Sequence, residues 1–183
     1  APAPSSPELA TGAAVAVLAR GADAVYLFNY FQDGVWPRPD YLRTLEAMGS
    51  LDTLLKLPRT VGTTYRDIIA PGEDYRPPLP ATGTDLTFPF VLGPLPGEDG
   101  TYSVLVEIQP PAQDETDVPL VTVNGLATTP RLGDPAVQGA GITVFNVPFE
   151  ALTGRDAQQV RIESRTGSPL TLRRFEVSIA PAQ

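Results

Sequence analysis

The sequence lacks cysteine and histidine, and it contains one methionine, one tryptophan and one lysine. Without cysteine the chain forms no disulfide, and its redox compartment stays open. Without histidine, Ser-His-Asp and Cys-His catalysis are excluded within the chain, as are zinc sites built on histidine. Carboxylate chemistry, calcium binding through oxygen ligands, or no chemistry at all are left. We therefore expect no cofactor.

Positive charge is also scarce. Thirteen lysine and arginine residues face 21 acidic ones, which gives a net charge of −8. An acidic chain lacks the positive charge that attracts nucleic acid or anionic lipid. No apolar run reaches the length of a membrane-spanning helix. We expect neither nucleic acid nor a membrane among the partners.

The chain begins Ala-Pro-Ala-Pro, without a methionine or a signal-like region. This beginning suggests a processed or excised start, with any signal peptide outside this chain. A secreted or periplasmic location is compatible with it.

The composition predicts a folded, loop-rich β protein. Hydrophobic residues make up 42% of the 183 residues, enough for a packed core, and charged residues make up only 19%. The 21 prolines are more than twice the average usage of about 5% and cluster at segment edges.

The first part of the chain reads as a helix followed by a buried strand. Ser5 to Glu8 has the form of a capping box, apolar residues recur at helical spacing, and Gly21 fits the left-handed residue after a helix end. These signals predict a helix over 6–20. Residues 24–31 are apolar on both faces, as in strands of parallel sheets covered by helices. The chain holds only one such strand, so the rest of that sheet is missing.

Two short helices and a connector come next. Leucine spacing predicts helices over 41–48 and 51–57, the second ended by Pro58. Residues 59–84 are rich in proline and glycine and predict an extended connector on the surface. The expected organisation is a helix–strand–helices segment over 1–58, the connector, and a second unit over 85–183.

From residue 85 the apolar period changes to two, which indicates β-strands. Asn124-Gly125 is a strong hairpin-turn pair. The apolar phase shifts between Leu172 and Phe175, which predicts a β-bulge. Strands of this length between Gly/Pro turns favour a mainly-β fold, a β-sandwich or jelly roll. The expected strands lie at 86–92, 102–108, 121–123, 126–131, 142–147, 158–164 and 170–179.

The segment Gly-Ala-Asp-Ala-Val-Tyr-Leu-Phe-Asn-Tyr-Phe, residues 21–31, carries a resemblance. It is similar to the last barrel strand of bacterial glycoside-hydrolase-like (β/α)8 proteins, in which a Leu-rich segment and a β-sandwich follow. Ala24 stands where glycine is usual, and seven of the eight barrel strands are absent. The resemblance implies a carbohydrate-related C-terminal region whose accessory sandwich stabilises or extends the barrel.

The resemblance also implies that the chain alone is not catalytic. Barrel enzymes assemble their sites from several strand ends, and glycosidases generally need two carboxylates across the scissile bond. Such a pair would sit mainly on strands that this chain lacks. The expected partner is the remainder of an α/β barrel, in the same parent chain or a separate one, or a second copy joined through the 24–31 strand. A carbohydrate is the expected ligand.

Three residues near the end of the 24–31 strand are candidate ligand-binding positions. Asn29 lies where a barrel presents substrate-facing groups, although it also suits a satisfied polar group ending a buried strand. Asp33 offers a carboxylate at the barrel mouth, although a turn role before glycine is the simpler interpretation. Trp36 could stack on a sugar ring or pack its loop onto the domain.

Two other readings stay open. The acidic loop over 113–117 could supply calcium ligands, but it lacks the spacing of an EF-hand loop and suits a solvated charge run. The sandwich could be a carbohydrate-binding module, which grips glycans through exposed aromatics, or a purely structural or interaction domain. Few aromatics lie outside the alternating core positions, and no tryptophan lies in the sandwich, which weakens the binding-module reading. The few are Phe145, Phe149 and Phe175.

Overall fold

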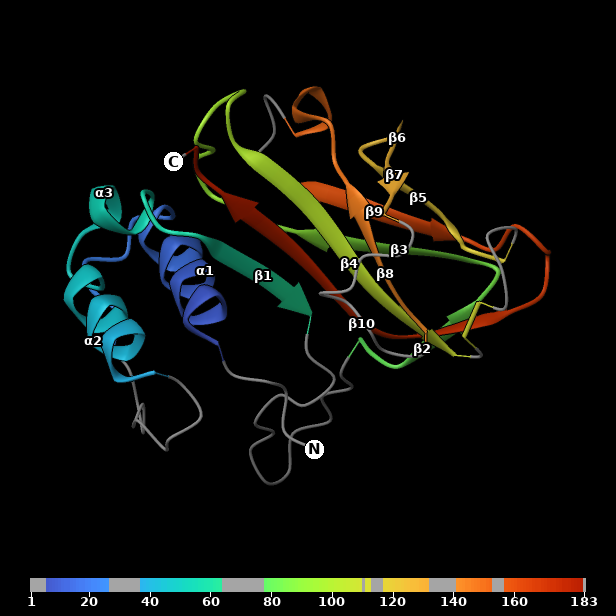
Figure 1. The fold of residues 1–183 in the computed structure, drawn as a ribbon, viewed down its shortest axis with the longest axis horizontal. Coiled ribbons are helices and arrows are strands. Elements are labelled where there is room, and N and C mark those ends of the chain that lie inside the picture. The colour runs from blue at the N-terminus through green and yellow to red at the C-terminus, as the bar shows by residue number, and fades with distance from the viewer. Residues whose placement is uncertain are drawn as a thin grey trace.

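The computed structural model describes residues 6–26, 37–63, 78–109, 111–112, 117–131, 141–152 and 157–182. Two antiparallel sheets form a mainly-β sandwich, and helices gather at one end of it (Figure 1). The β-sandwich expected from the alternating apolar residues is confirmed.

Helices α1 (Pro7–Leu18), α2 (Arg38–Ala47) and α3 (Leu51–Leu54) fall where the sequence predicts them. Helices α1 and α3 are shorter than expected, whereas α2 begins three residues earlier and ends one residue earlier. Ser6 caps α1, since its side chain accepts a hydrogen bond from the Leu9 amide at 3.2 Å. Gly21 has a φ of 92°, the left-handed conformation expected after the helix end.

The larger sheet has six strands. Its order is β1-β10-β4-β8-β7, and β2 also pairs with β10. Every pair in it is antiparallel. Its strands are β1 (Arg59–Thr63), β2 (Ala81–Gly83), β4 (Thr101–Gln109), β7 (Thr129–Pro130), β8 (Ile142–Asn146) and β10 (Leu170–Ala180).

The smaller sheet has four strands in the order β3-β9-β5-β6, also antiparallel. Its strands are β3 (Asp85–Phe90), β5 (Leu120–Val123), β6 (Leu126–Ala127) and β9 (Gln158–Glu163), and a short 3-10 helix, η2 (Phe149–Ala151), precedes β9. Apolar side chains of both sheets meet in one core, where the rings of Phe88 and Phe175 lie 5.3 Å apart.

Two local predictions for the sandwich are confirmed. Asn124 and Gly125 form the turn between β5 and β6, with φ values of 51° and 85°. The register of β10 against β4 shifts between Leu172 and Arg174, so a bulge lies where the apolar phase changes.

The surface connector expected over 59–84 is wrong at both ends. Residues 59–63 form β1, which pairs along its whole length with β10, and residues 81–83 form β2. The apolar pattern missed β1 because only Val61 among its five residues is aliphatic. Residues 64–77 lie outside the described part, and the domain boundaries at 58 and 84 stay predictions.

The strand expected over 24–31 is not formed in its described part. Residues 24–26 have no strand pairing, and Tyr26 is 86% exposed. A lone strand has no neighbour to satisfy its backbone groups, so this part stays irregular. Residues 27–31 lie outside the described residues, and pairing of a second copy through this strand remains a prediction.

Candidate functional site

The three candidate ligand-binding residues, Asn29, Asp33 and Trp36, lie outside the described residues. The structure therefore brings none of them to a described position, and their roles stay predictions. Most of the acidic loop, residues 113–116, also lies outside. In the part of the chain that the structure describes, no cluster of three or more acidic side chains could hold a metal ion.

The helical segment has a small core of its own. Ala14 and Val15 of α1 pack with side chains of α2 and α3, and this cluster is separate from the sandwich core. The segment therefore has apolar contacts of its own. Its buried members are Ala14, Val15, Ala47, Met48 and Leu54.

Helix α1 lies directly against β1, with Gly12 close to the backbone of Thr60. A Cβ added to Gly12 would overlap the carbonyl oxygen of Thr60 and lie 2.7 Å from its carbonyl carbon. In Figure 1, α1 lies on the side of β1 away from β10, so it covers an edge of the larger sheet. Covering an edge strand with a helix removes a template for unwanted pairing.

A loop of the sandwich contacts α1 at a second position, Val15. Gly93 has a φ of 67°, and a Cβ there would lie 2.7 Å from Cγ1 of Val15. Glycine at this position thus serves both the left-handed backbone and the close contact with α1. Helix α1 therefore packs against two parts of the sandwich, β1 and the loop around Gly93.

Two buried side chains hold that loop in place. Arg59 is 1% exposed, and its Nη2 donates to the carbonyl of Pro94. The hydroxyl of Tyr102 on β4 donates to the carbonyl of Gly97 at 2.6 Å. Nε and Nη1 of Arg59 have no hydrogen-bond partner within the described ranges. Sequence reasoning missed Arg59, because nothing in its surroundings marks a loop-holding residue.

Burial shifts the titration of both side chains. Desolvation lowers the pKa of Arg59, and the nearby Tyr102 acts in the opposite direction. Desolvation also raises the pKa of Tyr102, against the smaller effects of its bond to Gly97 and of Arg59. The neutral phenol is therefore the form that the fold favours.

We expect alkaline conditions to weaken the fold through Tyr102. A folded-state pKa above that of a free tyrosine, about 10, contributes stability that is complete below that pH and is lost as the pH rises through the folded value. Urea unfolding followed from neutral pH to above pH ~10 should show a steeper loss for wild type than for Tyr102→Phe.

Tyr26→Phe is the control for that comparison, because Tyr26 is 86% exposed. Its pH profile should follow the wild type. Equal alkaline slopes for wild type and Tyr102→Phe would show that Tyr102 ionises alike in folded and unfolded chains.

A shallow pocket of 80 Å³ lies between the N-terminal parts of α1 and α2. Two carboxylates, Glu8 and Asp40, are among its lining residues, but Asp40 is paired with Arg43 at 2.6 Å. The hydroxyls of Thr11 and Thr44, also in its lining, donate to helix carbonyls of their own turns. The side chains of Asp40, Thr11 and Thr44 in this pocket are therefore already engaged.

Aromatic side chains of the sandwich do not form a glycan platform among the described residues. Phe145 and Phe175, which the sequence left as candidates, are 1% and 0% exposed. The bulge in β10 restores the inward phase and turns Phe175 into the core. Phe149 is half-buried, and its ring lies 5.6 Å from that of Tyr102. Both packing roles weaken the binding-module reading further.

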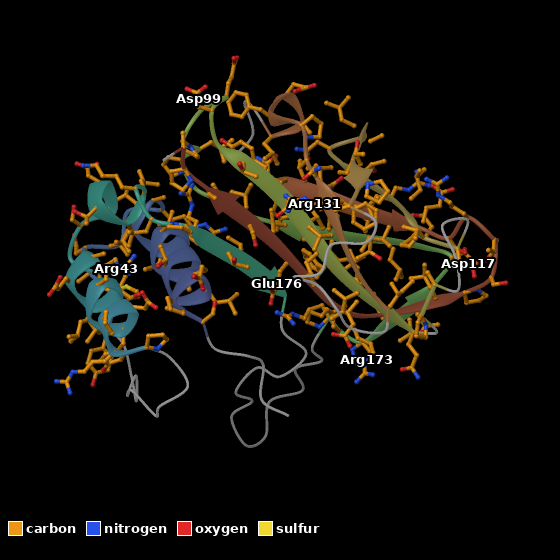
Figure 2. All side chains as sticks on the ribbon, viewed as in Figure 1. Arg43, Asp99, Asp117, Arg131, Arg173 and Glu176 are labelled. Carbon is orange, nitrogen blue, oxygen red and sulfur yellow. The ribbon has the colours of Figure 1, made fainter. Side chains whose placement is uncertain are left out.

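Charged side chains are dispersed rather than convergent. Figure 2 shows Arg43, Asp99, Asp117 and Arg173 at separate corners of the molecule. On the outer face of the smaller sheet, Arg161 pairs with Asp85 at 2.7 Å, and this contact holds the pKa of Asp85 below its usual value.

Among the described residues, no helix is long and apolar enough to cross a membrane.

Comparison with known proteins gives only distant likenesses. No family model matches the chain, and no curated protein matches it. Two crystal structures of BuGH86 in complex with neoagarooctaose, one of them of a variant, align with TM-scores of 0.37 and 0.38. Sequence identity is 16% and 14%, over 66% and 68% of this chain. The chain spans only 19% of the length of each BuGH86 chain, and a likeness this distant carries no argument about function.

Proposed function

We propose that this chain is the non-catalytic C-terminal region of a glycoside-hydrolase-like protein, in which the β-sandwich braces the last α/β unit of a barrel. The observation that carries the proposal is the contact of Gly12 with the backbone of Thr60. Residues 1–58 resemble the end of such a barrel, and this contact fixes their first helix directly onto the sandwich.

The junction suits a brace better than a flexible tether. Strand β1 follows the helical segment directly and belongs to the larger sheet, so the chain enters the sandwich as a strand. The loop around Gly93, held by Arg59 and Tyr102, supports α1 at a second point. A segment held by both a strand and a supporting loop moves with the sandwich.

The helical segment carries apolar side chains that are exposed to solvent. Val17 of α1 is 48% exposed, Leu42 of α2 is 42% exposed, and Tyr26 is 86% exposed. Between Leu9 and Ala19, α1 carries no charged residue. A helix that is apolar on all sides is typical of a buried helix. This surface fits a segment that packs against the remainder of a barrel.

The purified chain should show no turnover of a broad panel of polysaccharides and chromogenic glycosides. Glycoside hydrolysis generally needs two carboxylates placed across the bond, and Asp40 in the pocket of α1 and α2 is neutralised by Arg43. Reducing-end release, followed by chromatography over long incubations, is the measurement.

Glu8→Gln and Asp40→Asn make that result decisive. Any turnover that survives purification and then disappears in either variant would contradict the non-catalytic assignment and move the site to this pocket. Background activity that is equal in all three proteins would come from a contaminant.

A further inference from the structure

The turn between β5 and β6 holds an asparagine followed by glycine. Asn124 has a φ of 51° and Gly125 a φ of 85°, as in a two-residue hairpin turn with both residues left-handed. Asparagine is one of the few side-chain-bearing residues that adopts this conformation readily. The turn geometry explains the dipeptide but leaves the role of the Asn124 side chain open.

The carboxamide of Asn124 reaches out of the turn to two other elements. Its Nδ2 donates to the carbonyl of Ala151 in η2 at 2.6 Å and to Oε1 of Gln158. Its Oδ1 accepts from the backbone amide of Gln159 on β9 at 2.9 Å. Both hydrogens and one lone pair of the side chain are therefore in use. The backbone partners also assign the two ends of the carboxamide, since the carbonyl of Ala151 requires a donor and the amide of Gln159 requires an acceptor.

We propose that Asn124 is a site of spontaneous deamidation that the native fold keeps closed. In the reaction, the backbone nitrogen of Gly125 forms a bond to Cγ of Asn124, its proton passes to the departing amide nitrogen, and ammonia leaves. Water then opens the resulting succinimide ring at one of its two carbonyls, which yields aspartate or an isoaspartyl linkage. Gly125 has no Cβ to hinder the approach of its nitrogen to Cγ.

The hydrogen bonds of Asn124 oppose each part of this reaction. Ring closure turns Cγ back onto the turn and away from the amide of Gln159, the donor to Oδ1. The nitrogen that must leave is the one held by Ala151 and Gln158. Gln158 is itself 2% exposed, so its oxygen holds the carboxamide from the interior side. All three bonds must break before ammonia departs.

The products do not fit the place that Asn124 occupies. An aspartate has no hydrogen to donate, so its carboxylate would face the carbonyl of Ala151 and Oε1 of Gln158, two acceptors. An isoaspartyl linkage lengthens the backbone of a turn whose two residues set the register of β5 against β6. Deamidation in the unfolded chain would thus weaken the hairpin in the molecules that refold.

The test compares the full-length chain folded in alkaline buffer with the same chain unfolded in urea. Peptide mapping by mass spectrometry follows conversion at Asn124, and Asn146, which precedes valine, is the internal reference. If each of the three hydrogen bonds slows the reaction by a factor of about five, folded Asn124 reacts roughly 100-fold more slowly than unfolded Asn124. Equal rates in the two states would overturn the proposal.

A variant tests whether the hydrogen bonds of the Asn124 side chain slow deamidation in the folded state. Gln158→Met keeps a long side chain but removes the acceptor for Nδ2, and it should speed deamidation of folded Asn124 by about fivefold. Asn146 should stay unchanged, and hydrogen exchange in β9 reports whether the variant is folded. An unchanged rate at Asn124 in a folded variant would show that the hydrogen bond to Gln158 does not slow deamidation. The wild-type comparison does not depend on this variant.

Discussion

Replacing Gly12 with alanine is expected to lower the free energy of unfolding by about 2 kcal/mol. Helix propensity alone predicts the opposite sign, since alanine is better than glycine in a helix by about 1 kcal/mol. The new methyl group would overlap the carbonyl oxygen of Thr60, and that oxygen belongs to β1, whose pairing with β10 holds it in place. Overpacking against a fixed backbone therefore outweighs the gain in propensity.

Hydrogen exchange should show which part of the molecule is destabilised. Amides of α1 should lose protection, whereas those of β4 and β9 in the sandwich interior should keep theirs. Gly49→Ala, in the turn after α2, is the control for a methyl group that meets no neighbour, because nothing lies within 4 Å of a Cβ added there. A gain in melting temperature for Gly12→Ala that equals the gain for Gly49→Ala would show that α1 does not sit on β1, and the proposed brace would fail with it.

Asn124→Asp is expected to lower the free energy of unfolding by roughly 3 kcal/mol at neutral pH. The substitution removes both donated bonds and places a carboxylate against the oxygens of Ala151 and Gln158. Losing a donor while its acceptor stays buried costs about 1–3 kcal/mol for each group. Only the bond accepted from Gln159 survives. Urea unfolding at fixed pH is the measurement.

Asn146→Asp makes the same chemical change where the structure tolerates it. Asn146 is exposed, and its Oδ1 accepts from Nε of Arg131 at 2.5 Å, a role that a carboxylate fills equally well. Its stability should change little. Similar losses for both aspartate variants would trace the effect to added negative charge on a chain of net charge −8, and not to the hydrogen bonds of Asn124.

Local sequence signals predicted most strands of the sandwich, but the single strand expected over 126–131 is divided into β6 and β7, which belong to different sheets. Strand β4 alternates strictly between buried and less buried residues, so its period of two was visible without any partner. The hairpin turn followed from Asn124-Gly125, and the bulge in β10 followed from its change of phase. Each of these signals is written in consecutive residues, which is why a single sequence displayed it.

Features that depend on distant partners were not predictable in the same way. The sequence of β1 predicts a connector, because its strand character comes from pairing with β10, far along the chain. Arg59 gave no sign of burial, since arginine is usually exposed. The contact of Gly12 with Thr60 could not be named from the sequence, because the two residues lie far apart along the chain. Asn29, Asp33 and Trp36 remain predictions.

Strand β10 has a consequence for the order in which the molecule is made. It pairs with β1, β2 and β4, so it is the strand on which most of the larger sheet is assembled. A ribosome delivers β1 long before it delivers β10, and until then β1 and one edge of β4 have no strand partner. The larger sheet therefore closes only after β10 has been made, and until then those edges are open to pairing with other molecules.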